Sequence, residues 1–209
     1  MKMNLKNKSI KKLNIKLTSK NLFIFLISFS IITILIGIIF YFLLSTSDKE
    51  TVNQSVKAIF TIKSNINYLE VLKEELLKNT YNIFLIWVLG ISVIGVLAAI
   101  FIYFCELFSV GLTLASIINI YKVKGILGCI SYLLASKICY IVLLFILTFF
   151  SVKISYKLIK LCFSNEEINM KKEIKNYFKV LIFSFILIIV ISMLTAFIDN
   201  IFIKIFTSI

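Results

Sequence analysis

Two charged residues lie inside otherwise apolar sequence and are the first candidates for chemistry. Glu106 is the only charged residue in the stretch 79–121, and Lys137 is the only one in the stretch 125–152. A charge at the centre of a bilayer costs about 2.5–3.5 kcal/mol, so such a residue usually faces a bundle interior and is a candidate for function. For Lys137 two other interpretations stay open: the long stem reaches the membrane surface, or the helix breaks nearby.

The remaining side chains offer little for catalysis. There is no His, which excludes Ser/His and Cys/His arrangements and a mixed Cys/His zinc site. Glu106 has no second acid in the apolar segments, and no glycine-rich phosphate loop is present. The cysteines form no C-x-x-C motif, and we interpret them as buried thiols acting as small apolar residues: Cys105, Cys129, Cys139 and Cys162. We predict a protein that is not an enzyme and holds no cofactor.

The composition is that of a membrane protein. The chain of 209 residues is 60% hydrophobic, with a mean hydropathy of +1.03, whereas soluble domains are about 45–50% apolar. All 23 basic residues are Lys and the net charge is +13. In a soluble protein this charge would suggest nucleic acid as a partner. Here the lysines flank apolar spans, so orientation in the membrane explains them better. We predict the lipid bilayer, and no nucleic acid, as a partner.

Apolar runs of about 20 residues predict the membrane spans. Residues 1–20 carry seven Lys and no acid, and residues 153–179 carry seven Lys and three acids, so we place both in the cytoplasm. Four spans between these two segments put them on the same side. We predict an all-α polytopic bundle of about five transmembrane helices, with a cytoplasmic N-terminus. The predicted spans are 21–44, 82–103, 107–121, 125–152 and 180–198, with outer segments at 45–81 and 199–209.

Small residues recur along the predicted helical hairpin of the second and third spans. Gly95 and Ala99, and likewise Gly111 and Ala115, are four residues apart and lie on one helix face. In lipid, helices associate over small residues that allow close approach. We predict that at least one pair packs a helix interface. The alternative is that Gly and Ala are simply common in membrane helices.

The outer segment 45–81 predicts an amphipathic helix. Between Thr46 and Tyr81 it has five Lys and five acids, a balance that suits the outer face. Apolar residues recur at helical spacing and are candidate partner-binding residues: Ile62, Ile66, Leu69, Leu72 and Leu76. Such a helix lies on its own membrane or bundle, or it meets a partner. A later S-x-x-E pattern, Ser164 to Glu167, predicts a capping box that starts another helix.

A glycine-containing motif begins at Trp87 and reads Trp87-Val-Leu-Gly90-Ile-Ser92-Val-Ile-Gly95. It is followed by Gly111 and later by Lys124-Gly125-Ile-Leu-Gly128. With these residues the chain resembles the stage II sporulation protein M family. The length, the basic N-terminus and the five predicted spans agree. The chain departs from the family in the fourth span, where members often carry a Pro and this chain reads Ser131-Tyr-Leu-Leu-Ala-Ser-Lys137. The resemblance gives Lys137 no role.

The resemblance implies a non-enzymatic membrane scaffold. Members look like anchors that assemble with the stage II sporulation proteins D and P, which degrade peptidoglycan during engulfment of the forespore. The expected location is the mother-cell membrane at the sporulation septum. The rival hypothesis is a transport or channel subunit that uses Lys137 and Glu106, and a homo-oligomer stays open under both.

Overall fold

The computed structural model describes residues 19–65, 68–132, 137–163 and 169–208. The described residues form six helices and no strand. The helices are α1 (Ser19–Leu43), α2 (Thr46–Asn65), α3 (Tyr68–Gly90), α4 (Gly95–Tyr132), α5 (Ile138–Phe163) and α6 (Met170–Ser208). Four contain a stretch long and apolar enough to cross a membrane: Ser19–Leu43, Gly95–Ile130, Ile138–Leu161 and Met170–Thr195. The prediction of an all-α membrane bundle with about five spans is confirmed.

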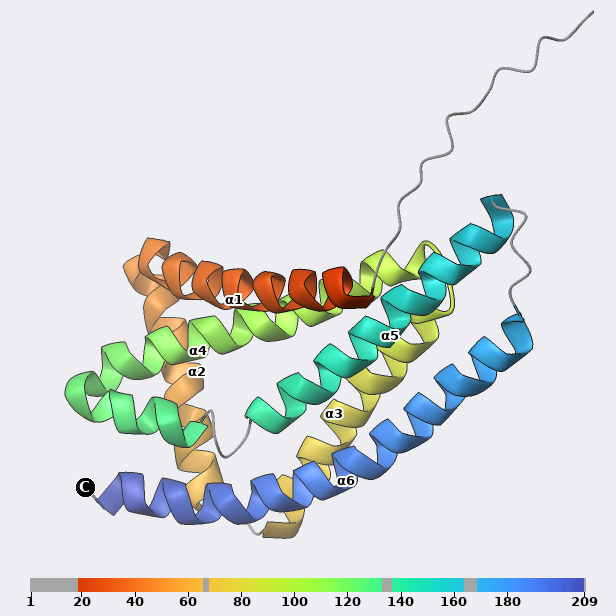
Figure 1. The fold of residues 1–209 in the computed structure, drawn as a ribbon. Helices are drawn as coiled ribbons and strands as arrows, with labels where there is room; N and C mark the ends of the chain where they lie inside the picture. The colour runs from red at the N-terminus through yellow and green to blue at the C-terminus, as the bar shows by residue number, and fades with distance from the viewer. Residues whose placement is uncertain (1–18, 66–67, 133–136, 164–168, 209) are drawn as a thin grey trace, which may run out of the picture.

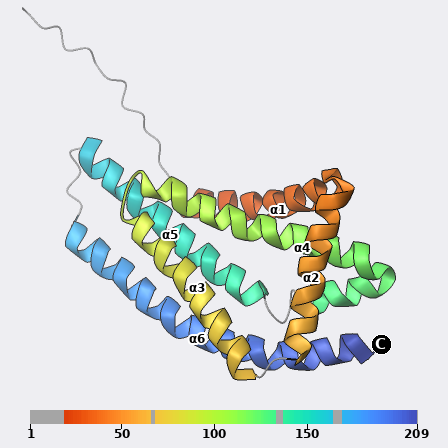
Figure 2. The same cartoon turned by 180° about the vertical axis from the view of Figure 1, so that it is seen from behind.

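The five long helices run between two ends of the molecule, and α2 crosses one of these ends (Figure 1). α1 lies beside the first part of α4, whereas α3, α5 and α6 form a second group tilted against that pair (Figures 1 and 2). We call the end crossed by α2 the α2 end. The opposite end, where α5 ends and α6 begins, carries seven lysines and is called the basic end: Lys153, Lys157, Lys160, Lys171, Lys172, Lys175 and Lys179.

α3 runs between the two ends although it is less apolar than its neighbours. Its first half is charged, and the uncharged part, 79–90, is too short to span a bilayer by itself. Ile83 and Ile86 are fully buried in the main core, where they lie with Leu107 of α4 and Leu144 of α5. The position of α3 is therefore set by packing inside the bundle, and its hydropathy alone does not predict it.

The turn of the central hairpin lies at 91–94 and differs from the predicted turn near Glu106. The Ser92 hydroxyl accepts a hydrogen bond from the Gly95 amide (3.3 Å), and the Ser92 carbonyl accepts one from the Val96 amide (3.2 Å). Ser92 therefore caps α4 at its first turn. Glu106 lies in the middle of α4, so the boundaries predicted at 82–103 and 107–121 are replaced by those of α3 and α4.

α4 reverses direction within a single residue. Lys122 has φ 51° and ψ −121°, and the chain after it returns along the helix it has just left (Figure 1). The approach is close, because a Cβ on Gly125 would lie 2.7 Å from the Ile117 carbonyl oxygen. The span predicted at 125–152 is therefore divided between this returning segment, 123–132, and α5. The interpretation of a helix break near Lys137 agrees with α5 beginning at Ile138.

The contact between α1 and α4 depends on two glycines. A Cβ on Gly37 would lie 2.5 Å from the Phe108 carbonyl oxygen, and a Cβ on Gly111 would lie 2.3 Å from the Ile34 carbonyl oxygen. Neither site has room for a side chain, since the atoms in the way belong to backbone. Gly37 was not among the predicted packing residues.

The outer segment is two helices instead of the single amphipathic helix predicted. Ile62 belongs to α2, whereas Leu69, Leu72 and Leu76 belong to α3, and Ile66 lies outside the described residues. The apolar spacing continues across the junction, so periodicity alone could not reveal the break. At the other end of the chain, α6 continues to Ser208, so the predicted tail 199–209 is mostly helical. The predicted capping box at Ser164 lies outside the described residues.

Candidate functional site

Trp87 anchors the end of α3 against α6. Its indole ring stacks on Tyr177, with 5.7 Å between ring centroids and 15° between planes, and makes a T-shaped contact with Phe178. Trp87 Nε1 donates a hydrogen bond to the Tyr177 carbonyl (3.3 Å), and Tyr177 Oη donates one to the Trp87 carbonyl (3.1 Å). The two residues therefore bind each other through both ring and backbone. We call residues 87–95, with their contacts on α5 and α6, the corner.

Two serines of α5 complete the corner. Because Tyr177 Oη donates to Trp87, the single hydrogen of Ser151 Oγ is shared between Tyr177 Oη (2.6 Å) and the Ile86 carbonyl (3.3 Å). Ser155 Oγ donates to the carbonyls of Gly90 (2.8 Å) and Ser92 (3.2 Å). Both serines are buried. The corner therefore joins α3, α5 and α6 with hydrogen bonds that are buried inside the bundle.

The corner satisfies every backbone carbonyl at the end of α3. The last four carbonyls of a helix have no partner within it. In α3, Tyr177 donates to Trp87 and Ser155 donates to Gly90, while the turn amides of Ile91 and Ser92 donate to Val88 and Leu89. A buried helix end without such partners is costly, because its carbonyls lose their contact with water and gain no other donor. This is the physical reason for two serines and a tyrosine at this position.

Gly90 leaves no room for a side chain inside the corner. A Cβ there would lie 2.3 Å from Tyr177 Oη and 2.5 Å from Ser151 Oγ. Any larger residue would displace the hydroxyls that bind the end of α3. Gly95 is equally confined, since a Cβ there would lie 2.3 Å from the Leu89 carbonyl oxygen across the turn.

The two residues predicted as intramembrane charges, Glu106 and Lys137, both lie near Tyr140. The amide nitrogen of Asn82 donates to Glu106 Oε1 (2.8 Å) and to Tyr140 Oη (3.0 Å), while Lys137 Nζ lies 5.7 Å from the Tyr140 ring centroid. We call Asn82, Glu106 and Tyr140 the polar cluster. It joins α3, α4 and α5, and it places Glu106 in a hydrogen-bonded position inside the bundle.

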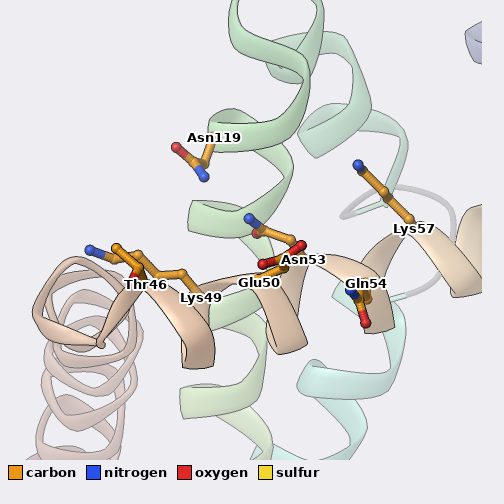
Figure 3. Close-up of a pocket in the computed structure, with 7 residues that line it drawn as sticks. All are labelled: Thr46, Lys49, Glu50, Asn53, Gln54, Lys57 and Asn119. Carbon is orange, nitrogen blue, oxygen red and sulfur yellow. The ribbon is translucent and has the colours of Figure 1, made fainter.

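A third polar group holds α2 across the α2 end. Asn53 Oδ1 of α2 accepts hydrogen bonds from Tyr41 Oη of α1 and from Ser116 Oγ of α4, each 2.7 Å long. Asn119 Nδ2 of α4 donates to Tyr41 Oη (2.8 Å). Beside this group lies an open pocket of about 470 Å³, the α2 pocket, drawn in Figure 3. Six of its lining residues come from α2 and one from α4: Thr46, Lys49, Glu50, Asn53, Gln54, Lys57 and Asn119.

The other predicted residues are distributed over several contacts. Ala99 is fully buried in the main core, Gly111 lies at the α1 crossing and Ala115 is buried nearby. Gly125 and Gly128 are buried in the returning segment. Among the candidate partner-binding residues, Leu69 is exposed while Leu72 and Leu76 are half-buried.

The interpretation of the cysteines as buried thiols holds for Cys129 and is wrong for Cys105 and Cys139, which are exposed on apolar helix faces. A thiol tolerates an apolar environment such as lipid, so burial in protein is not required. The Cys162 side chain lies outside the described residues. Within the described part of the chain, no group of three or more His, Cys, Asp or Glu could hold a metal ion.

Sequence reasoning missed the polar partners of the corner and of the polar cluster. Ser151, Ser155 and Tyr177 carry no charge, and Asn82 is only the first residue of the span predicted at 82–103. A signal was present, since two serines four residues apart, at the end of an apolar run and just after it, lie on one helix face. Which helix they meet could not be predicted, because that depends on tertiary contacts.

The comparisons with known proteins agree with this architecture. A family model described as Stage II sporulation protein M matches residues 23–199. No curated protein and no solved structure gives a match. The matched region includes the corner, the polar cluster and the reversal at Lys122. The family match covers most of the chain, and the chain therefore belongs to the stage II sporulation protein M family.

Proposed function

We propose that this protein is a non-enzymatic membrane scaffold for forespore engulfment. In this proposal it localises the peptidoglycan-degrading stage II sporulation proteins D and P at the mother-cell membrane of the sporulation septum. The observation that carries the proposal is membership of the family over residues 23–199. The geometry supports it, because the polar side chains of the corner bind helix ends and one another, as in a structural framework.

Deletion of the gene in its host tests the sporulation role. We expect cells without the protein to begin sporulation and to stop before the mother-cell membrane has surrounded the forespore, as seen with a membrane dye. Restoring the wild-type gene should restore migration of the membrane. Normal engulfment in the deletion strain would reject the role.

An exposed stripe on α3 is the part of the surface that we assign to the protein partners. Leu69 and Leu77 are 73% and 65% exposed, and Tyr81 follows on the same face. The stripe lies at the α2 end, which we assign to the outside of the cell because the lysine-rich segment 153–179 lies at the opposite end. Apolar side chains exposed beside Lys73 and Lys78 are unusual at a lipid surface and suit a partner helix.

The double variant Leu69→Gln/Leu77→Gln should lower the amount of proteins D and P that co-purifies from sporulating cells, while the variant still inserts into the membrane. Val123→Gln is the matched control, since Val123 is an apolar residue at the same end and is even more exposed, at 82%. Equal recovery of both partners with the double variant would contradict this assignment of the surface.

The orientation is tested by cysteine labelling after the four native cysteines are removed. A cysteine at position 67 should react with an impermeant maleimide in intact cells, and one at position 169 should react only after the membrane is opened. Finding both positions on the same side would overturn the topology.

The polar cluster favours one alternative, a transport or channel subunit. Asn82 binds Glu106 inside the bundle, where an acid could take part in ion movement. Replacing Lys137 with Leu separates the two functions. A scaffold should still recover its partners, whereas a permease should lose flux in proteoliposomes. Glu106→Gln keeps the hydrogen bond from Asn82 and should likewise abolish flux only in a permease.

A further inference from the structure

The α2 pocket lies at the level where a bilayer changes from hydrocarbon to headgroups. α1 has 25 residues and is about 37 Å long, so it crosses the hydrocarbon core and ends near the interface. α2 begins three residues after Leu43 and turns across the helix ends (Figures 1 and 2). Tyr41, an aromatic residue of the kind enriched at this depth, donates to Asn53 on the pocket wall.

The pocket wall carries more donors than acceptors. The lining contains two lysines, Lys49 and Lys57, and one acid, Glu50, so its net charge is +1. The two lysines are eight residues apart, about 12 Å along α2, with Asn53 and Gln54 between them. Figure 3 shows Asn119 of α4 on the far side of the pocket from α2. This set of ammonium and amide groups is suited to one phosphate with hydroxyl groups attached to it.

The hydrogen bonds of Asn53 orient its amide for such a ligand. Its oxygen accepts from both Tyr41 and Ser116, which fixes the side chain and directs the NH₂ group away from these two hydroxyls. The donor side of this amide therefore remains on the pocket wall, held by contacts that exist without any ligand. A site whose donors are already oriented loses less entropy on binding.

The rim of the pocket meets an apolar surface. Lys49 Nζ donates to the Phe42 carbonyl (2.9 Å), which joins the rim to the end of α1. Phe42 and Leu43 are 61% and 76% exposed there, and Ile39 and Leu35 continue an exposed apolar face along α1. A ligand with a phosphate in the pocket could place hydrocarbon chains along this face.

We infer that the α2 pocket binds the headgroup of an anionic glycerophospholipid of the surrounding bilayer, of the phosphatidylglycerol type. The phosphate lies with Lys57 and the Asn53 amide, Lys49 adds positive charge at the rim where it binds the Phe42 carbonyl, and the glycerol hydroxyls donate to Glu50. The acyl chains lie along α1. The bound lipid holds α2 on the membrane surface, a role that does not depend on the identity of any protein partner.

The test uses the full-length protein in detergent and measures bound lipid by native mass spectrometry. The probes are phosphatidylglycerol, phosphatidylcholine of the same acyl chains, and inorganic phosphate. We expect phosphatidylglycerol to bind in preference to phosphatidylcholine. The double variant Lys49→Gln/Lys57→Gln should bind phosphatidylglycerol about tenfold more weakly, the loss expected for a charge-assisted contact to phosphate.

Lys73→Gln is the matched control, because Lys73 lies at the same end on α3 and outside the pocket. It should retain the wild-type affinity within about twofold. Far-ultraviolet circular dichroism checks that each variant keeps its helices. Equal affinity of the double variant and wild type, or equal loss in Lys73→Gln, would overturn the site. Binding of inorganic phosphate as tightly as phosphatidylglycerol would overturn its assignment to a lipid.

Discussion

The corner and the α2 end both join several helices through polar side chains, but one is closed and the other is open. In the corner, Tyr177, Ser151 and Ser155 are all buried and their hydroxyls bind backbone carbonyls. At the α2 end, Asn53 is only half-buried, and its partners stand beside an open pocket. The difference indicates that the corner maintains the fold, whereas the α2 end is able to exchange contacts with molecules outside the chain.

The largest effect should come from filling the corner with Gly90→Ala. The new methyl group would displace Tyr177 Oη or Ser151 Oγ, and overpacking of this kind costs about 1–3 kcal/mol. The thermal midpoint in detergent, followed by the fluorescence of the single Trp at position 87, should fall. Ser109→Ala, on the exposed face of α4, is the control. An unchanged midpoint would show that the corner is more adaptable than its geometry indicates.

Tyr177→Phe removes two hydrogen bonds from the corner and keeps its ring against Trp87. Hydrogen bonds between membrane helices contribute about 0.6 kcal/mol each on average, so we expect a loss of about 1 kcal/mol. The same fluorescence assay measures it, with the exposed Tyr81→Phe as control. If Tyr177→Phe and Tyr81→Phe have the same thermal midpoint, the hydrogen bonds of Tyr177 do not stabilise the corner.

At the α2 end, Lys122→Gly should raise stability. Lys122 has a positive φ, which costs a residue with a side chain about 1–3 kcal/mol and glycine much less. We expect the free energy of unfolding to rise by about 1 kcal/mol. This is less than the relieved strain, because glycine also raises the conformational entropy of the unfolded chain. Lys124→Gly, two residues on within the returning helix, should instead destabilise. A loss in both variants would contradict strain at Lys122.

The smallest global effect should come from Asn53→Ala. The change removes the acceptor shared by Tyr41 and Ser116, so the amides of α2 should exchange hydrogen faster while the free energy of global unfolding changes by less than about 0.5 kcal/mol. Hydrogen exchange with mass spectrometry measures the exchange of the α2 amides, the Trp87 fluorescence assay measures global stability, and Gln54→Ala is the control. Global unfolding of Asn53→Ala would mean that the α2 end is as essential to the fold as the corner.

The sequence predicted what depends on composition and missed what depends on individual contacts. Long apolar runs and lysine-rich flanks predicted the membrane bundle and the two basic segments. The central turn was misplaced because Ile91, Val93 and Ile94 are apolar and give no turn signal, whereas the charge of Glu106 looked like one. Asn82, which binds that charge inside the bundle, comes from another helix, so no local pattern could reveal it.

The reversal at Lys122 was missed for a related reason. Lysine is not a turn residue, and a positive φ at such a position is held only by the packing around it. Gly125 and Gly128 were recognised as family residues, but their part in the close return of the chain is visible only in three dimensions. The family resemblance came from the corner sequence, whose buried partners on α5 and α6 lie more than 50 residues away in the chain.

The crossing of α1 and α4 has a thermodynamic consequence. At Gly37 and Gly111 each backbone lies directly over a carbonyl of the other helix, a geometry that favours reciprocal Cα–H···O contacts and dispersion. Both faces are already out of water before they meet, so their association changes the heat capacity little. The attraction between α1 and α4 is therefore mainly enthalpic, and cooling should strengthen it, whereas the cohesion of a water-soluble core weakens in the cold.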